Sequence, residues 1–439
     1  MHRRDWVGFA SVTAALSLNR LCVSSEPISD QSHRVNTRMI TRPPGNHWFG
    51  YYDKFEFSPD DELVLSNRVD FEHRAPTGDD SIEVGFVDTA DSDRWHSIGR
   101  SRSWGWQQGC MLQFIGETGR RVMYNDRDQD RFVCRLVDLD SGQRQTIGRP
   151  VYTLSPDGRY GLSVDFSRLD ALRPGYGYDG LSSQLIHDRA PEDDGVWRVD
   201  MSTGQSQLIF SYADAAQMPW LNQEGQSSVP DTAWHYFNHL LTNPSGDRFI
   251  VLHRYRPKFD PKTLRYEGNF VTRMLTIGMD GSDPYVLDGS GRTSHFIWRD
   301  DEAVEMWTRV GKSPDRFYCM YDQSNMIEPL GHDVMTLNGH NTRLPKPYND
   351  FILNDTYPSK DGRLQTVYLY HVPTGTRLDL GAFHSPSQYR GEWRCDTHPR
   401  SSRSGRFVAI DSPHATVAKP TAGRQVHLLD IGEVLDAFT

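Results

Sequence analysis

Short apolar runs recur along the chain, and each is broken by a turn rich in Asp, Gly and Pro. From residue 45 onward one unit repeats: two strands joined by an SPDG-type turn, then two strands joined by a turn such as DLDSGQ. Apolar and polar residues alternate within the runs, which predicts half-buried strands. Asp and Gly accept the backbone conformations that tight hairpins need. Helical periodicity is scarce, although LLDIGEVLDAF near the C-terminus predicts a short closing helix.

Seven copies of this unit account for residues 39–439. They begin near His47, Trp106, Tyr152, Asn238, His295, His340 and His398. Repeats of roughly 40 to 60 residues, each with four short strands, are typical of a β-propeller. We therefore predict an all-β fold, a single seven-bladed β-propeller with four antiparallel strands per blade.

Two insertions interrupt the repeats, at residues 167–195 and 211–236. The first falls inside blade three and carries the aromatic, glycine-rich stretch PGYGY at residues 174–178. A loop of this length is either functional or disordered, and its composition favours a lip beside a binding site. The second insertion precedes blade four and predicts a helix and loop across the same face.

Residues 1–38 are interpreted as a leader followed by a polar linker that begins at residue 22. Arg3 and Arg4 are adjacent and precede a moderately apolar run, as in a twin-arginine export signal. We expect export to the periplasm or the extracellular space, and a cytoplasmic protein with a frayed leader is the alternative. No later segment has the roughly 18 apolar residues of a membrane helix, so no membrane span is expected.

Charge and cysteine content narrow the classes of partner. A net charge of −10 argues against nucleic acid, which is bound through clustered Lys and Arg. Arginines at strand ends still suit carboxylates, so an acidic small substrate is compatible with the sequence. The five cysteines are widely spaced, with no CxxC pair, and do not decide the redox compartment. We expect a monomer or a weak homo-oligomer.

Histidine is concentrated at the unit starts. In a propeller the innermost strands line the axial channel, so residues at their starts converge at one end of it. The predicted ring consists of His47, Gln108, Tyr152, His239, His295, His340 and His398. A structural role accounts for a lone histidine, whereas five at one repeat position favour a function. Converging imidazoles bind divalent metals or transfer protons near neutral pH.

Other candidate groups lie beside the ring. Asp396 stands two residues before His398, which places both side chains on one face of an extended strand as a pair of ligands. Arg394 and the Tyr51–Tyr52 pair are close in sequence to unit starts. A second set of residues lies at the ends of the second strands, and most of its members are interpreted as hydrogen-bonding groups of turns and blade contacts. The set consists of Asp70, Asp126, Asp165, Arg254, Arg309, Asp355 and Asp411.

Three stretches resemble motifs of the oligogalacturonate lyase family. NHLLTNP with His239, SHFIW with His295 and WRCDTHP with His398 are similar to G-H-x-x-F-x-P, T-H-E-F-W and Q-x-T-H-P-H-P. Members of that family are seven-bladed propeller enzymes that cleave short uronides by β-elimination with a manganese-type metal. Trp393 stands where the family has glutamine, and Asp396 where it has the first histidine of the H-P-H pair. Either the site is rebuilt with Asp396 or His340, or there is no metal site.

The resemblance implies a carbon–oxygen lyase that acts on an acidic oligosaccharide, with manganese or calcium as the candidate cation. His295, Asp396 and His398 are expected to bind the metal or to neutralise the uronate carboxylate. His239 and His340 are expected to carry protons. Expected substrate contacts are His47, Tyr52, Trp106, Gln108, Arg254, Arg309 and Arg394.

Two other functions compete with a lyase. A non-enzymatic binding propeller of the WD-repeat or translocation-accessory type needs no histidine ring, and such scaffolds usually show a blade-locking dipeptide that this sequence does not carry. A glycoside hydrolase on the same scaffold is the other alternative. Sialidase-like propellers display a box that ends in tryptophan, which SPDGRYGL lacks.

Overall fold

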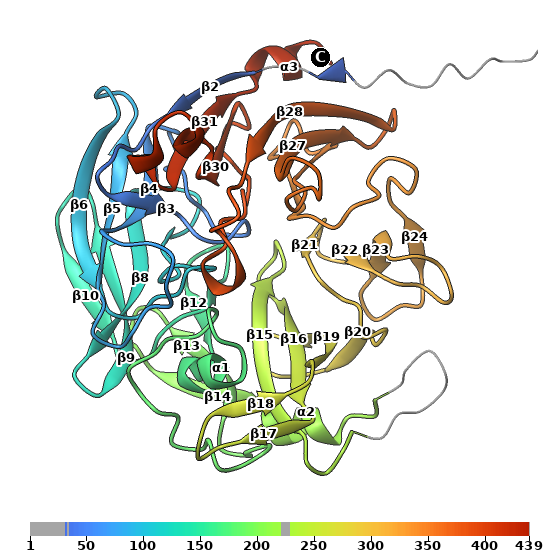
Figure 1. The fold of residues 1–439 in the computed structure, drawn as a ribbon. Helices are drawn as coiled ribbons and strands as arrows, with labels where there is room; N and C mark the ends of the chain where they lie inside the picture. Colours follow the sequence, from blue (N-terminus) through green and yellow to red (C-terminus); the bar gives the residue numbers. More distant parts are fainter. Residues whose placement is uncertain (1–30, 33–34, 221–228, 439) are drawn as a thin grey trace, which may run out of the picture. The chain divides into compact units, whose positions relative to one another are not determined.

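The strands of the described residues form seven blades around a central axis (Figure 1), and a separate two-stranded hairpin forms an eighth sheet. The computed structural model describes residues 31–32, 35–220 and 229–438. The predicted export leader lies outside the described residues. Each blade contains four antiparallel strands, and one blade gains a fifth strand that pairs in parallel. This confirms the seven-bladed, all-β prediction.

The first four blades contain the strands that follow. Blade one has β3 (Asn46–Trp48), β4 (Leu63–Val69), β5 (Ile82–Asp88) and β6 (Arg94–Ser101). Blade two has β7 (Gln113–Phe114), β8 (Arg121–Asp128), β9 (Arg131–Asp138) and β10 (Arg144–Ile147). Blade three has β11 (Thr153–Leu154), β12 (Tyr160–Ser163), β13 (Gly195–Asp200) and β14 (Ser206–Ser211). Blade four has β15 (Trp234–Thr242), β16 (Arg248–Arg256), β19 (Val271–Gly278) and β20 (Tyr285–Asp288), with a hairpin of β17 (Lys258–Asp260) and β18 (Arg265–Glu267).

The last three blades complete the ring. Blade five has β21 (Phe296–Trp298), β22 (Ala303–Thr308), β23 (Arg316–Tyr321) and β24 (Ile327–Pro329). Blade six has β25 (Thr342–Arg343), β26 (Phe351–Asn354), β27 (Leu364–His371) and β28 (Thr376–His384). Blade seven has β29 (Arg400–Ser401), β30 (Phe407–Ser412) and β31 (Gln425–Asp430). Three short 3₁₀ turns, Gly391–Trp393, His414–Val417 and Pro420–Ala422, lie next to blade seven, and α3 (Gly432–Asp436) is the predicted closing helix.

The outer strand of blade seven comes from the other end of the chain. Strand β2 (Asn36–Met39) pairs antiparallel with β31, so the two ends of the propeller share one sheet (Figure 1). Strand β1 (Gln31–Ser32) pairs with the outer strand of blade six. Residues 22–38 were expected to form a linker, but residues 31–32 and 36–38 belong to these two strands. Strand β2 is short and has no fully buried residue, so its own pattern gives no strand signal, and only its partner reveals it.

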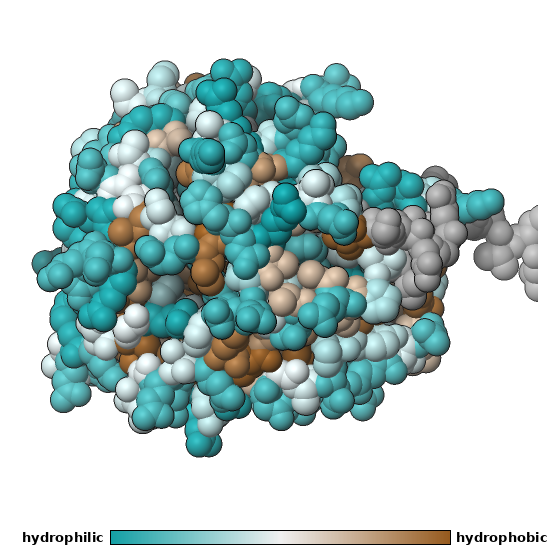
Figure 2. Space-filling model, turned by 90° about the horizontal axis from the view of Figure 1, so that it is seen from below, coloured by the Kyte–Doolittle hydropathy of each residue, from teal (hydrophilic) through white to brown (hydrophobic). Residues whose placement is uncertain are grey.

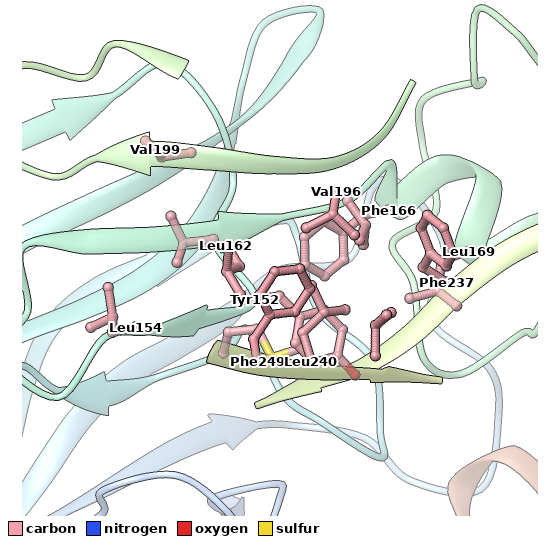
Figure 3. Packing of buried hydrophobic residues seen from close by; sticks show 14 of the residues in the cluster. Tyr152, Leu154, Leu162, Phe166, Leu169, Val196, Val199, Phe237, Leu240 and Phe249 are labelled. Carbon is pink, nitrogen blue, oxygen red and sulfur yellow. The ribbon is translucent and has the colours of Figure 1, made fainter. Parts of the chain in front are cut away.

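The insertion in blade three is docked onto the propeller by its aromatic side chains. It begins as helix α1 (Phe166–Leu172), whose first turn is capped by the side chain of Asp165. Figure 3 shows Tyr152, Phe166, Leu169 and other apolar residues of blades three and four packed together. The rings of Phe166 and Tyr178 stack with centroids 4.3 Å apart. The insertion is therefore an ordered part of the fold.

A buried arginine ties this insertion to blade four. The Arg168 guanidinium is fully buried and donates to four backbone carbonyls, those of Leu185, Asp188, Arg189 and His235.

The second insertion forms the predicted helix as α2 (Tyr212–Gln217), which starts with a capping box of Ser211 and Asp214. Arg273 of β19 donates to the Ala215 carbonyl at 2.7 Å and holds this helix against blade four.

The exterior is polar with isolated apolar side chains. Figure 2 shows one face, which is mostly hydrophilic with hydrophobic residues scattered between polar ones. Exposed apolar residues such as Leu264, Met326 and Val417 lie far apart in the sequence, and scattered ones of this kind are normal for soluble domains. Within residues 31–32, 35–220 and 229–438, no helix has the length and apolar character needed to cross a membrane.

Blade seven is joined to blade one by a buried ion cluster. Arg400 donates to Glu56 at 2.8 and 3.1 Å and to Asp411 at 3.0 Å. Asp411 in turn accepts from the backbone N–H groups of Phe49 and Gly50. After Trp48 the chain leaves the sheet, and pairing with β4 resumes only at Phe57. We call residues 49–55 the blade-one detour, and Asp411 fixes its start.

We expect replacement of Arg400 by Met to lower the free energy of unfolding by about 3–5 kcal/mol, because two buried carboxylates lose their cation. Denaturant unfolding monitored by tryptophan fluorescence measures this loss. Arg406 makes an exposed ion pair with Asp436, so Arg406→Met should cost far less. Equal losses in the two variants would contradict a structural role for the buried cluster.

Candidate functional site

Four of the five predicted histidines gather at the axis. The ring of His340 lies 4.1 Å from that of His295 and 4.2 Å from that of His398, measured between centroids. Tyr51 bridges His398 and His239, with its ring 5.1 Å from the first and 4.9 Å from the second. His239 lies within β15, and the other three lie one or two residues before β21, β25 and β29. All four imidazoles are buried.

His47 does not join this cluster. Its ring packs edge-on against Trp95 at 4.9 Å, and its backbone N–H donates to the carbonyl of Arg424. The chain leaves the sheet just after His47, so the blade-one detour brings Tyr51 and Tyr52 to the axis instead. The position predicted for His47 is therefore corrected, because the unit alignment took no account of the detour.

Three of the buried side chains form a group with metal-binding geometry. One ligand atom from each of His340, Asp396 and His398 lies within 4.8 Å of the others. Nδ1 of His340 pairs with Asp355 at 2.9 Å, which directs Nε2 of the ring toward the group. Among the described residues, Nε2 of His340 and Nε2 of His398 have no hydrogen-bond partner. Two orphaned imidazole nitrogens beside a carboxylate fit a divalent cation.

His295 has a different environment from the one predicted. Its Nδ1 pairs with Oδ1 of Asn338 at 3.0 Å, and its Nε2 with the hydroxyl of Tyr357 at 3.3 Å. Both ring nitrogens are thus occupied by hydrogen bonds. The geometry groups His340, rather than His295, with Asp396 and His398, which exchanges the roles expected for the two histidines.

His239 stands apart from the metal-binding group. Its Nδ1 pairs with the amide of Gln108 at 3.2 Å, and that amide also bonds to the hydroxyl of Tyr152. The amide nitrogen of Gln108 donates to Nδ1, which leaves the proton of the neutral ring on Nε2. When the amide is turned over, its oxygen accepts from Nδ1–H and Nε2 has no proton. Nε2, which faces the Tyr51 hydroxyl at 3.4 Å, can therefore gain or lose a proton.

The backbone is strained at two of the histidines. His239 and His398 have φ angles of 53° and 39°, in the left-handed region that favours glycine. At His239 a register shift in β15 between Asn238 and Leu241 accompanies this conformation. Each such residue costs about 1–3 kcal/mol, and strain of this kind clusters at functional sites.

Burial keeps three of these imidazoles neutral. It lowers the pKa of His239, His295 and His398 well below the usual value, and the positive charge of Arg254 adds to this effect at His239. At His398 and His295 the neighbouring imidazole of His340 adds to it. Neutral imidazole is the form that binds metals and accepts protons.

Two of the three predicted arginines are near the cluster. Arg394 donates to Asp396 at 2.6 Å and to the hydroxyl of Tyr176 at 2.9 Å. Arg254 is buried with its guanidinium 4.5 Å from the Phe270 ring centre. Arg309 instead forms an ion pair with Asp315 at a partly exposed position.

Trp106 belongs to the core and not to the site. Its indole packs against Trp48 at 5.0 Å and Trp104 at 5.2 Å, and Nε1–H donates to the carbonyl of Arg74. The predicted sugar contact is therefore wrong, since a side chain with 2% exposure has no free face. An aromatic residue near a unit start fits a core position as well as a binding platform, so the sequence did not separate the two.

Tyr52 lies between the histidines and an axial pocket. Its ring is 5.4 Å from that of His340, and its hydroxyl donates to the carbonyl of Phe296. It also lines a pocket of about 550 Å³. All seven blades contribute to this pocket, for example through Asp53, Glu117, Pro156, Asn243, Trp298, Arg343 and Arg403.

Several site residues were not predicted individually. Tyr176 lies in the predicted lip and meets His239 edge-on, with ring centroids 5.5 Å apart. Asp355 was assigned only to blade contacts, and Asn338 and Tyr357 were not considered. The glycine-rich PGYGY stretch was the one available signal, because the partners of the other residues are apparent only in three dimensions.

Comparison with solved structures identifies propellers of the same fold. An oligogalacturonate lyase in complex with manganese is 12% identical, with a TM-score of 0.60 over 91% of this chain and 94% of that chain. An oligogalacturonate lyase from Vibrio parahaemolyticus is 14% identical, with a TM-score of 0.61 over 92% of this chain and 96% of that one.

No protein-family model matches the sequence, and no curated protein matches it either. At 12–14% identity the two lyase structures establish a shared fold. The resemblance drawn from the sequence motifs is thus confirmed for the architecture, over most of the chain.

The position of His47 generates a prediction about acid stability. Burial, reinforced by the nearby charge of Arg68, lowers its pKa to about 3. Below pH 6.5 the unfolded chain binds a proton that the folded chain does not, so stability falls as the pH drops from 6.5 toward 3. Between pH 6.5 and 5, His47→Asn should lose about 2 kcal/mol less than the wild type, as measured by urea denaturation. Parallel losses in the two proteins would contradict this.

Proposed function

We propose that the protein is a lyase that cleaves uronic-acid-containing oligosaccharides by β-elimination, with a divalent cation held by His340, Asp396 and His398. The observation that carries this proposal is a pair of buried imidazole nitrogens beside Asp396 that have no hydrogen-bond partner in the described part of the chain, next to a separate neutral histidine, His239. The first group suits a cation, and His239 suits proton transfer. Their proximity at one end of a propeller axis supports a single reaction site.

Three residues are proposed to bind the cation directly, and a fourth orients one of them. Nε2 of His340 and of His398 and one oxygen of Asp396 are the ligands, and Asp355 orients the ring of His340 through Nδ1. A bound divalent cation would neutralise the uronate carboxylate and stabilise the charge that develops there. Manganese is the proposed ion, supported by the manganese complex of the structurally similar lyase.

β-Elimination requires removal of the proton on C5 and departure of the substituent on O4. We assign the removal of the C5 proton to Nε2 of His239 in the neutral tautomer with its proton on Nδ1, where the oxygen of the turned Gln108 amide accepts from Nδ1–H. As the C5–H bond breaks, its electrons form the C4–C5 double bond, and the C4–O4 bond breaks. Arg254 and Arg394 supply positive charge beside an anionic substrate.

The cellular setting is proposed on the sequence alone. The twin-arginine-type leader supports action outside the cytoplasm, where extracellular acidic polysaccharides would be encountered. We propose a monomer or weak homo-oligomer as the working form.

Incubation with oligouronides from pectic, glucuronic and algal sources should yield products with a C4–C5 double bond, detected by ultraviolet absorbance and mass. His239→Ala should lower kcat by about 10²- to 10⁴-fold, because general base catalysis is lost. His187→Ala is a matched control, since His187 is exposed on the first insertion. Absence of unsaturated product from every uronide tested would overturn the proposed function.

The purified protein should bind about one manganese ion per chain, as measured by plasma mass spectrometry after dialysis. His340→Ala and His398→Ala should abolish this binding, and Asp355→Asn should weaken it by about 10- to 100-fold through loss of ring orientation. His295→Ala should retain the metal, because both nitrogens of His295 are already hydrogen-bonded. Loss of metal in His295→Ala alone would refute the proposed ligand set.

A further inference from the structure

The departing O4 needs a proton, and the expected donor is not free to supply it. His340 was expected to carry protons, but its Nδ1 pairs with Asp355 and its Nε2 faces the metal-binding group. We propose that Tyr176, from the first insertion, is the general acid that protonates O4. This inference rests on the proposed function.

Tyr176 is placed beside the proposed base. Its ring lies edge-on to His239 with centroids 5.5 Å apart, and its hydroxyl bonds to the Arg394 guanidinium at 2.9 Å. A second guanidinium, that of Arg173, is centred 4.8 Å from the Tyr176 ring. One phenol thus faces two cations and a neutral imidazole in the same buried region.

The backbone on both sides of Tyr176 is tightly packed. Gly175 has φ +89°, which a residue with a side chain rarely adopts. A Cβ on Gly177 would lie 2.3 Å from the carbonyl oxygen of Phe166 in α1. Tyr178 then stacks on Phe166. Tyr176 is therefore fixed relative to blades three and four, as a proton donor must be to act on a bound substrate.

The surrounding charges favour loss of the phenolic proton. Burial alone would raise the pKa of Tyr176, but Arg394 and Arg173 outweigh it and lower the pKa to about 8. Asp396 opposes them in part. The charged and titratable groups around the ring are Arg173, Arg254, Arg394, Asp396, His239, Tyr51 and Tyr357. A donor with a pKa near the working pH transfers protons most effectively.

His239 and Tyr176 together account for every proton that the reaction moves. Nε2 of His239 takes the C5 proton and becomes imidazolium, while the C4–C5 double bond forms and the C4–O4 bond breaks. The Tyr176 hydroxyl gives its proton to O4 and becomes a phenolate that Arg394 and Arg173 stabilise. Transfer of a proton from His239 to Tyr176 then restores both groups, so no external acid or base is consumed.

Tyr176→Phe tests the inference in the full-length, manganese-loaded protein. We expect kcat on the best oligouronide to fall by about 10²- to 10⁴-fold with little change in KM, because only the donated proton is lost. Bound manganese should be unchanged, since Tyr176 is not among the ligands. Tyr178→Phe is the matched control, because its hydroxyl bonds to Asn125, and it should keep most of the activity.

The pH dependence of kcat in Arg173→Met provides a second test. A purely structural role of Tyr176 would leave this pH dependence unchanged. Activity should fall as the pH rises through the pKa of Tyr176, because the donor must be protonated. Removing Arg173 raises that pKa, so the falling limb of the kcat profile should shift to higher pH. An active wild type with an undiminished Tyr176→Phe variant, or with an unshifted profile in Arg173→Met, would overturn this inference alone. Absence of lyase activity in the wild type would overturn the proposed function together with it.

Discussion

The ion cluster of Arg400, Glu56 and Asp411 is the interaction on which the site depends. A buried guanidinium between two buried carboxylates stabilises little by itself, because desolvation offsets most of the attraction. The ion cluster matters because it fixes the positions of other parts of the structure. It holds blade seven against blade one, and Asp411 also accepts from the two N–H groups at the start of the blade-one detour. That detour carries Tyr51 and Tyr52 to the axis, where their rings pack against the histidine cluster.

The axial site concentrates features that lower stability. Four imidazoles are buried, two of them on left-handed backbone, and two ring nitrogens have no partner within the described chain. A propeller that only binds proteins through its rim gains nothing from these features, and ordinary core packing would remove them. Strain and unpaired polar atoms that persist in an otherwise well-packed fold favour a function for the site. This argument is independent of the resemblance to the lyases.

The parts of the structure that follow local rules could be predicted from the sequence. The blades were found because alternation and turn chemistry are local, and His239, His295, His340 and His398 were found because they recur at one position of the repeat. Strand β2 was missed because its strand character comes from pairing with β31, almost four hundred residues later in the chain. The positions of His47 and Trp106 were predicted wrongly because they too depend on contacts that a local pattern does not show. The detour that excludes His47 from the axis is fixed by Asp411, a residue of another blade, and no local pattern reveals it.

The departure of WRCDTHP from the motif of the oligogalacturonate lyase family is linked to other features of the axial site. Asp396 stands where the resembling family has a histidine, which adds a negative charge to the ligand set. Arg394, two residues earlier, pairs with this carboxylate at 2.6 Å and offsets that charge. The same guanidinium donates to the hydroxyl of Tyr176, so the compensating cation also reaches the proposed acid. In the proposed arrangement His340 is a ligand and therefore does not transfer protons. The exchange of one histidine for Asp396 would then explain the nearby Arg394, the position of the proposed acid and the changed role of His340, which favours a rebuilt site over a lost one.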